Sequence, residues 1–247
     1  MKRVLLTGDW HCGSSFGLTP PAWQGGEFQD LQEKLWAFWE EITAEDYDIV
    51  ILLGDLIDGG IDVIDHVSLD RVEQIKMASE VIRLLKAKTI RILTGTPLHV
   101  SGTAEFEKFL DARPNIKVLR EGRFEIEDLR LHARHTGRDS QTPYGLEGAL
   151  KKESVRQVWL DTVYLGLPPP DLVLRGHVHR YAFVDGKPVS AVSVPCLQYP
   201  FSGFGSTISK WGYDMGVAVL EISGRAFHIE PIRLGLKGLA ECRYESL

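Results

Sequence analysis

The first half of the chain alternates short apolar runs with amphipathic stretches, and this alternation most constrains the fold. The apolar runs are residues 4–7, 48–53 and 89–94, each short enough to be a buried strand. Residues 28–42 and 65–86 carry apolar side chains at helical spacing between them. A β-α-β-α-β order implies parallel strands joined by right-handed crossovers. We therefore expect an α/β fold with ligands beyond the carboxyl ends of the strands.

From residue 116 onwards the pattern changes to short strands with one further long helix, at residues 147–165. Strands are predicted at residues 116–119, 123–126, 129–135, 172–174, 181–184, 188–194, 216–222 and 226–232, and a short helix through Leu110. Two strand-rich halves, each with helices, indicate two sheets packed face to face with helices outside. No stretch has the composition of a linker, so we expect one domain over residues 1–247, with residues 235–247 as a C-terminal arm.

Composition excludes several classes of protein. The net charge of -6 argues against a broad basic surface for duplex nucleic acid. Three widely spaced cysteines form neither a disulfide framework nor a zinc-binding C-x-x-C pair. The N-terminus does not resemble a signal peptide, and no run reaches the roughly 18 apolar residues of a membrane span. We expect a cytoplasmic protein with no membrane partner.

Candidate polar residues follow each of the first three predicted strands and stand at the ends of two later ones. The run at 172–174 leads to Gly176 and then to two histidines, His177 and His179, one residue apart. If the backbone is still extended there, residues i and i+2 point the same way and face one pocket. Asp9 and His11 repeat this spacing. The full set of strand-end candidates is Asp9, His11, Asp55, Thr96, His99, His135, His177 and His179.

This set combines carboxylate oxygens with imidazole nitrogens and contains no thiolate. Such donors suit Mn, Fe, Co, Ni or Zn better than Ca or Mg, and we expect Mn first. The candidates are too many for one ion, which indicates two divalent ions about 3.5–4 Å apart, bridged by a carboxylate and a water. Such a pair lowers the pKa of the bridging water and neutralises phosphate oxygens, so the expected reaction is phosphoester hydrolysis.

The order of the motifs resembles that of a known family. D-x-H at residues 9–11, G-D-x-x-D at 54–58, a Gly-led loop ending in His99, an isolated His135 and G-H-x-H at 176–179 are similar to the motifs of the calcineurin-like metallophosphoesterases. The resemblance extends from Gly8 to His179 and implies a four-layer α-β-β-α sandwich of two mixed sheets with outer helices.

The resemblance also implies a division of the ligands. It assigns one metal to Asp9, His11, Asp55 and His179, and a second metal, bridged through Asp55, to His135 and His177. Asp58 would orient one of these ligands or hold its loop in place.

The third motif departs from the family pattern, which has Gly-Asn-His followed by Asp or Glu. Thr96 stands where the ligating Asn would be, and a neutral hydroxyl is a poorer ligand than an amide oxygen. His99 is displaced by two residues from the position of the family's general acid. Three outcomes follow: His99 protonates the leaving oxygen, His99 itself ligates the second metal, or the second site is weak.

Other candidates have competing interpretations. His135 competes with His132, and its side of the strand and the following Thr-Gly favour His135. Arg138 follows closely and either binds phosphate or is a solvated arginine. Tyr199 either forms part of a substrate wall, together with Phe201, or packs into the protein. His66 and His228 are interpreted as surface or packing histidines.

The leading functional hypothesis is a binuclear metal-dependent phosphoesterase, either a phosphodiesterase or a phosphatase. Its substrates would be phosphomonoesters or phosphodiesters, including nucleotides. A nuclease acting on single-stranded DNA or nucleic acid ends is the main rival. The capping region or basic groove usual in nucleases of the family is not evident in the sequence, and the aromatic residues in the loops suit a small or single-stranded substrate. The third candidate is a catalytically impaired binding or scaffold module, which the altered third motif favours.

Overall fold

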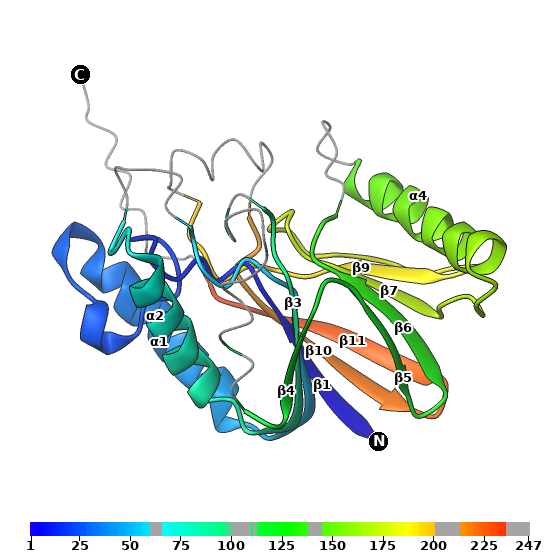
Figure 1. Ribbon diagram of the computed structural model, residues 1–247, viewed down its shortest axis with the longest axis horizontal. Coiled ribbons are helices and arrows are strands. Elements are labelled where there is room, and N and C mark those ends of the chain that lie inside the picture. The colour runs from blue at the N-terminus through cyan, green and yellow to red at the C-terminus, as the bar shows by residue number, and fades with distance from the viewer. Residues whose placement is uncertain are drawn as a thin grey trace.

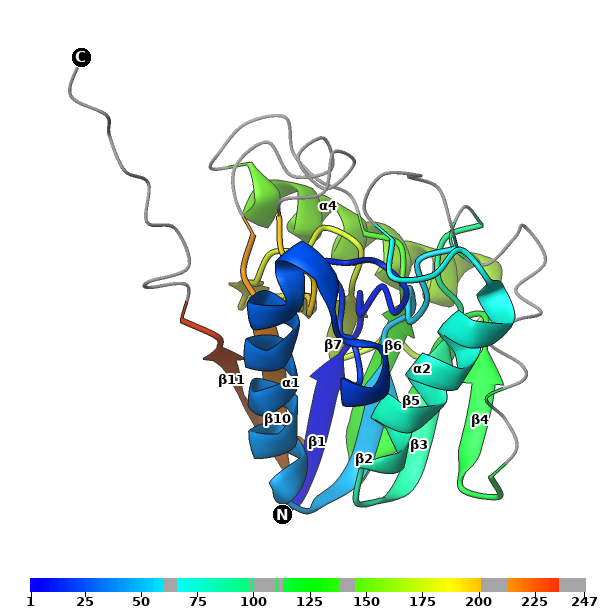
Figure 2. The ribbon, with the colours of Figure 1, turned by 90° about the vertical axis from the view of Figure 1, so that its left-hand side faces the viewer.

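The computed structural model arranges the chain in four layers, helix, sheet, sheet and helix. It describes residues 1–59, 66–97, 99, 110, 113–137, 145–200 and 213–235. Helices α1 and α2 lie on one side of the molecule and α4 on the other, with both sheets between them (Figures 1 and 2). The predicted fold class, a four-layer α/β sandwich of two mixed sheets, is confirmed.

The first sheet has six strands in the order β11-β10-β1-β2-β3-β4. Strands β1 to β4 run parallel, whereas β10 pairs antiparallel with both β1 and β11. The parallel arrangement of β1 to β3 and the positions of the two C-terminal strands were predicted from the sequence, whereas the parallel pairing of β4 with β3 was not. The strands are β1 (Lys2–Thr7), β2 (Tyr47–Leu52), β3 (Ala87–Leu93), β4 (Ile116–Leu119), β10 (Gly216–Ser223) and β11 (Ala226–Arg233).

The second sheet has five strands in the order β5-β6-β7-β9-β8. Its centre is parallel, β6 with β7 and β7 with β9, and each edge strand pairs antiparallel with its neighbour. The strands are β5 (Gly122–Ile126), β6 (Leu129–Arg134), β7 (Leu172–Arg175), β8 (Ala182–Val184) and β9 (Ser190–Ser193). The strands predicted at residues 181–184 and 188–194 are present and form a hairpin, because β8 and β9 are antiparallel partners.

Three α-helices form the outer layers among the described residues, and short helical turns accompany two of them. The helices are α1 (Gln29–Ala44), α2 (Arg71–Arg83) and α4 (Leu146–Trp159), with 3-10 turns η1 (Pro21–Trp23) and η2 (Gly26–Phe28) and a π-helical turn η3 (Leu160–Tyr164). Among the described residues, none of the helices has both the length and the apolar character needed to cross a membrane. Apart from Leu110 itself, the short helix predicted through Leu110 lies outside the described residues, as does most of the tail beyond Leu234.

Helix α2 is shorter than the predicted helix at residues 65–86. Asp70 caps it, because its side chain accepts a hydrogen bond of 2.9 Å from the backbone N–H of Val72. The residues before Asp70 are held by the loop after β1 instead, since the N–H of Val67 donates to the carbonyl of Gly13. Val72 is one of the apolar residues within the predicted helix, but its side chain is exposed.

Strand β1 shows how a continuous apolar run becomes a strand buried on both faces. Leu5 packs in the core beneath α1 and α2, whereas Val4 and Leu6 pack in the core between the two sheets. Successive side chains of a strand point to opposite faces, so each residue of the run contacts one core or the other. Leu172 and Leu174 of β7 reach the same inter-sheet core from the opposite side.

A buried polar cluster lies where α4 covers the second sheet. The guanidinium of Arg175 on β7 is within 3.3 Å of the Glu153 carboxylate on α4 and donates to Nδ1 of His132 at 3.2 Å. Arg134 donates to the same Glu153 oxygen at 2.5 Å. His132 is therefore a member of this cluster, whereas His135 follows the end of β6.

The pH dependence of stability should report on His132. Burial and the neighbouring Arg175 guanidinium lower the pKa of His132 to about 2. His132 stays neutral in the folded protein, while in the unfolded chain it protonates near its usual pKa of about 6.5. As the pH falls below about 6.5, this residue reduces stability by up to ~1.4 kcal/mol per pH unit.

We therefore expect His132→Gln to flatten the fall of the unfolding free energy, measured in urea, between pH 6.5 and 4.5. His228→Gln is the matched control, because His228 is exposed on β11 and its replacement should leave the slope unchanged. An unaltered slope in His132→Gln would show that His132 is not the residue responsible.

Candidate metal centre

Residues from five loops meet where the parallel strands of both sheets end. Asp9 and His11 follow β1, Asp55 follows β2, His99 follows β3, and the remaining histidines follow β6 and β7. Backbone hydrogen bonds join these loops: the N–H of Asp9 donates to Gly54, and the N–H of Gly176 donates to His135. The N–H of His177 donates to Asp9 Oδ2 at 3.0 Å, across 168 residues of sequence.

The backbone at these positions is not extended, so this part of the sequence-based reasoning was wrong. Six non-glycine residues have a positive φ in the part of the chain that the structure describes, and five of them are site candidates. These five are Asp9 (50°), His11 (48°), Asp55 (50°), His177 (73°) and His179 (54°). Non-glycine residues in the left-handed region cost of order 1–3 kcal/mol each and gather at functional sites. The loops therefore converge through left-handed turns, and His177 and His179 enter different groups.

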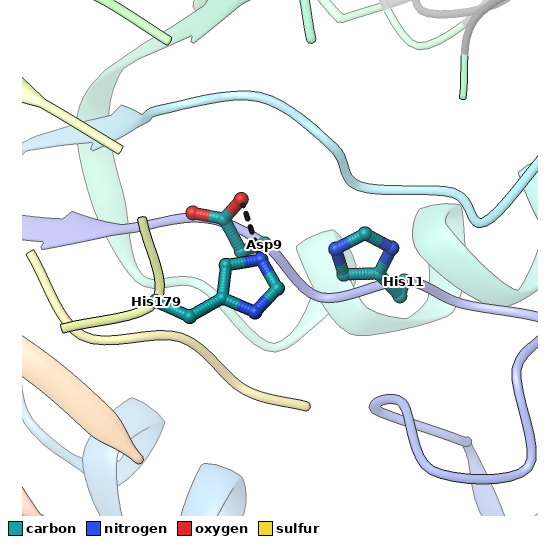
Figure 3. A group of neighbouring side chains, drawn as sticks. All are labelled: Asp9, His11 and His179. Atoms are coloured by element: carbon teal, nitrogen blue, oxygen red, sulfur yellow. Dashed lines mark ion pairs between the residues drawn. The ribbon is translucent and has the colours of Figure 1, made fainter. Parts of the chain in front are cut away.

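The first group consists of Asp9, His11 and His179. One ligand atom from each lies within 4.8 Å of the others, and all three residues are buried. Figure 3 shows Asp9 and His11 on the segment that follows β1, with the Asp9 carboxylate beside the His179 imidazole from a separate segment. The distance between His179 Nε2 and Asp9 Oδ1 is 3.2 Å.

The second group consists of Asp55, His135 and His177, again with ligand atoms within 4.8 Å of one another. His135 donates from Nδ1 to the carbonyl of Leu53 at 2.5 Å, and its Nε2 lies 2.9 Å from Asp55 Oδ2. His135 Nδ1 is also 4.0 Å from Asp9 Oδ1, so the two groups adjoin.

Thr96 and Gly95 surround the Asp55 carboxylate. The Thr96 N–H donates to Asp55 Oδ1 at 2.6 Å, and its hydroxyl lies 3.2 Å from Oδ2. Thr96 thus acts as a hydrogen-bond donor to Asp55 here. A Cβ at Gly95 would lie 2.5 Å from the Asp55 backbone nitrogen, so only glycine fits at that position.

Asp58 and His99 lie beside the first group. The Asp58 carboxylate accepts from His11 Nδ1 at 3.2 Å, which places it where it can orient that ring. His99 is buried and donates from Nδ1 to the backbone carbonyl of Asp58 at 2.6 Å. Its Nε2 is 3.7 Å from Asp55 Oδ2, and its ring centroid is 4.5 Å from that of His11.

Two contacts at the site were missed by the sequence analysis. His66 is not a surface histidine: its side chain is 4% exposed and its Nε2 lies 2.6 Å from Asp58 Oδ2. Tyr213 packs edge-on against His179 with ring centroids 5.0 Å apart. Neither residue belongs to a motif with a fixed spacing, so no local pattern could have identified it.

One further candidate, Tyr199, does not join the site. Tyr199 is buried in the core that packs beneath α1, with its N–H bonded to the carbonyl of Phe16, so this structure favours packing over a substrate wall. Arg138 and Phe201 lie outside the described residues.

The electrostatics of the site favour bound cations. Burial alone would raise the pKa of Asp55, but the imidazoles of His135, His99 and His11 hold it well below its usual range. Burial by itself would lower the pKa of His135. The negative charges of Asp55 and Asp9 together have a larger, opposite effect and raise this pKa to about 9. Protons on imidazoles thus neutralise the buried carboxylates, and metal cations can replace them.

Several buried donor atoms at the site have no hydrogen-bond partner among the described residues, as expected of metal ligands. His11 Nε2 is buried and has no hydrogen-bond partner among the described residues, while its Nδ1 is held by Asp58. Asp9 Oδ1 lies 3.2 Å from His179 Nε2, and His135 Nε2 lies 2.9 Å from Asp55 Oδ2. Neither of these contacts has the geometry of a hydrogen bond. Buried polar atoms are normally satisfied, and a divalent ion among these oxygens and nitrogens would satisfy them.

The protein is thus a sandwich of two sheets with outer helices. At one end of its strands lie two adjoining groups of carboxylates and imidazoles that could bind metal. Residues 2–102 match the family model of the calcineurin-like phosphoesterases. This match includes the motifs at Asp9 and Asp55, and the predicted resemblance to that family is confirmed. No curated protein is significantly similar to this chain in sequence.

Solved structures share the fold at low sequence identity. A Vps29 variant from Entamoeba histolytica is 14% identical with a TM-score of 0.50, over 94% of this chain and 99% of that one. An archaeal phosphodiesterase is 12% identical with a TM-score of 0.51, over 93% and 99%. Vps29 from Chaetomium thermophilum is 11% identical with a TM-score of 0.50, over 94% and 97%. These similarities establish the calcineurin-like phosphoesterase fold. The reaction has to be inferred from the residues of the site.

Proposed function

We propose that this protein is a metal-dependent phosphoester hydrolase with a binuclear centre of transition-metal ions. Asp9, His11 and His179 would hold one ion, and His135 and His177 the other, with Asp55 between them. The observation that carries the proposal is the pair of adjoining groups of carboxylate and imidazole donors, in which every residue but His177 is buried. Their mixed oxygen and nitrogen chemistry suits Mn, which we expect first, and also Fe, Ni, Co or Zn.

When bound, such ions polarise phosphoryl oxygens and lower the pKa of water, which generates a nucleophile near neutral pH. The protein's own groups prepare the site for them. Asp58 and the Leu53 carbonyl hold Nδ1 of His11 and His135, and this leaves Nε2 of both rings facing the carboxylates. Hydrogen bonds from Thr96 and from the N–H of His177 fix the two carboxylates themselves.

His99 is proposed as the general acid that protonates the leaving oxygen. The carbonyl of Asp58 fixes its ring through Nδ1, and its Nε2 remains on the side of Asp55. His99→Ala should therefore lower the rate at saturating metal by about 10²–10⁴-fold while both ions are retained. Rate and metal content, the latter by mass spectrometry, are measured on the same sample. Loss of one ion would identify His99 as a ligand instead, and His228→Ala is the control.

The test of the function is a substrate panel on metal-depleted protein resupplied with Mn, Ni, Zn or Mg. The substrates are para-nitrophenyl phosphate, its bis ester, cyclic nucleotides and single-stranded DNA. We expect hydrolysis of at least one phosphoester that depends on added Mn and stops with a chelator. Cleavage restricted to single-stranded DNA would favour the nuclease alternative. No metal-dependent turnover of any substrate would refute the hydrolase.

A binding module without catalysis is the second candidate, and one observation favours it. Thr96 replaces the Asn of the family pattern and donates hydrogen bonds to Asp55, so one expected ligand is missing from the second group. This candidate predicts that the protein binds metal without turnover.

A further inference from the structure

A hydrogen-bonded chain of three residues with largely buried side chains leads away from the first group of candidate ligands. His11 Nδ1 donates to Asp58 Oδ1 at 3.2 Å, and His66 Nε2 donates to Asp58 Oδ2 at 2.6 Å. The side chains of His11, Asp58 and His66 are 2%, 10% and 4% exposed. Each carboxylate oxygen of Asp58 thus has its own imidazole partner, in largely buried surroundings.

His66 reaches this position through backbone contacts that do not depend on Asp58. It forms an isolated antiparallel bridge with Ser14, and the N–H groups of Val67 and Ser68 both donate to the carbonyl of Gly13. This anchor is the same loop that carries His11. The segment with His66 is therefore fixed relative to the His11 backbone, so its imidazole is a rigid reference for the Asp58 carboxylate.

Asp58 alone would fix His11 less well. The last torsion of an aspartate side chain is broad, so a carboxylate held at one oxygen can rotate and weaken its bond to a ring. With Oδ2 bound to His66, Oδ1 stays directed at Nδ1 of His11. That bond selects the His11 tautomer with the proton on Nδ1 and aims the lone pair of Nε2 into the group with Asp9 and His179.

We propose that His66 is a positioning residue of the metal centre, which orders Asp58 and through it presents His11 Nε2 to the ion shared with Asp9 and His179. The inference rests on the metal binding proposed above. Outer partners of ligating histidines typically contribute 10–100-fold to metal affinity. His66 should therefore affect this ion and leave the one beside His135 and His177 unchanged.

The experiment compares His66→Leu with His66→Gln. Both variants and the wild type are stripped of metal, and MnCl₂ is titrated into each by calorimetry. His66→Leu removes the donor and should raise the Kd of one of two Mn sites by about 10–100-fold. The glutamine amide places a donor close to the position of Nε2, so His66→Gln should stay within about threefold of the wild type.

Thermal unfolding of the metal-free proteins separates positioning from a general structural role. We expect the two metal-free variants to melt at similar temperatures, with affinity lost only in His66→Leu. Wild-type affinity at both sites in His66→Leu would overturn the proposal, and so would equal loss of affinity in both variants. If the wild type itself binds no Mn, the proposed metal centre is wrong. This result is distinguishable from the two results that would overturn only the role of His66.

Discussion

Asp55→Asn should abolish metal-dependent phosphoester hydrolysis. Asp55 is buried between the candidate groups, with Oδ2 2.9 Å from His135 Nε2 and 3.7 Å from His99 Nε2. Asparagine keeps the size of the side chain but removes the negative charge that balances bound cations. We expect a loss on the order of 10³-fold or more in rate. The measurement is Mn-dependent hydrolysis of bis-para-nitrophenyl phosphate, together with the bound metal per chain.

Asp48→Asn is the matched control for this prediction. Asp48 lies on the same strand, β2, but at its other end, where it pairs with Lys2 in a partly exposed ion pair. Such pairs contribute about 0–1 kcal/mol to stability, so activity and metal content should be unchanged. An Asp55→Asn protein that retains wild-type rate and metal would show that this carboxylate is not part of the centre. Activity that vanishes only in Asp55→Asn would exclude the binding-module alternative.

Glu153→Ala should cost about 3–5 kcal/mol of unfolding free energy. Glu153 is the carboxylate partner of Arg175, whose side chain is completely buried, and also of Arg134. Burial lowers the pKa of Arg175 to about 10, so its guanidinium is still charged at neutral pH. Removal of Glu153 therefore leaves a buried cation without its counter-charge. The measurement is the free energy of unfolding from urea titration at pH 7.

Glu147→Ala on the same helix is the control, because Glu147 is exposed in the first turn of α4 and its loss should cost under about 1 kcal/mol. A double variant, Glu153→Leu with Arg175→Met, should recover much of the lost stability, since apolar replacement of a whole buried ion pair is often neutral. A cost of under about 1 kcal/mol in Glu153→Ala would mean that water reaches Arg175 and screens it.

The secondary structure could be predicted because hydrophobic periodicity, on which the prediction depends, is a property of short stretches of sequence. Strand β4 occupies the predicted residues 116–119, and the strands of the parallel core differ from their predicted bounds by a few residues at most. A strand buried on both faces must be apolar along its length, whichever partners it has. The predicted helix at residues 65–86 was too long because backbone bonds to Gly13 hold the segment before Asp70 outside the helix.

The candidate ligands could also be named from their order along the chain, but the geometry assumed for them was wrong. An extended backbone would have pointed His177 and His179 the same way. Instead both residues have positive φ and enter different groups. That conformation is costly in isolation, and the hydrogen bonds that join the loops after different strands help to maintain it.

The sequence by itself determined the layers of the fold and the residue types gathered at the strand ends, because hydrophobic periodicity and strand order are properties of the chain alone. Only the tertiary structure decided which candidate donors lie together in one group, that Thr96 donates to Asp55, and that His66 contacts Asp58. These arrangements depend on contacts between loops distant in sequence. No spacing along the chain encodes the distance or direction of such contacts.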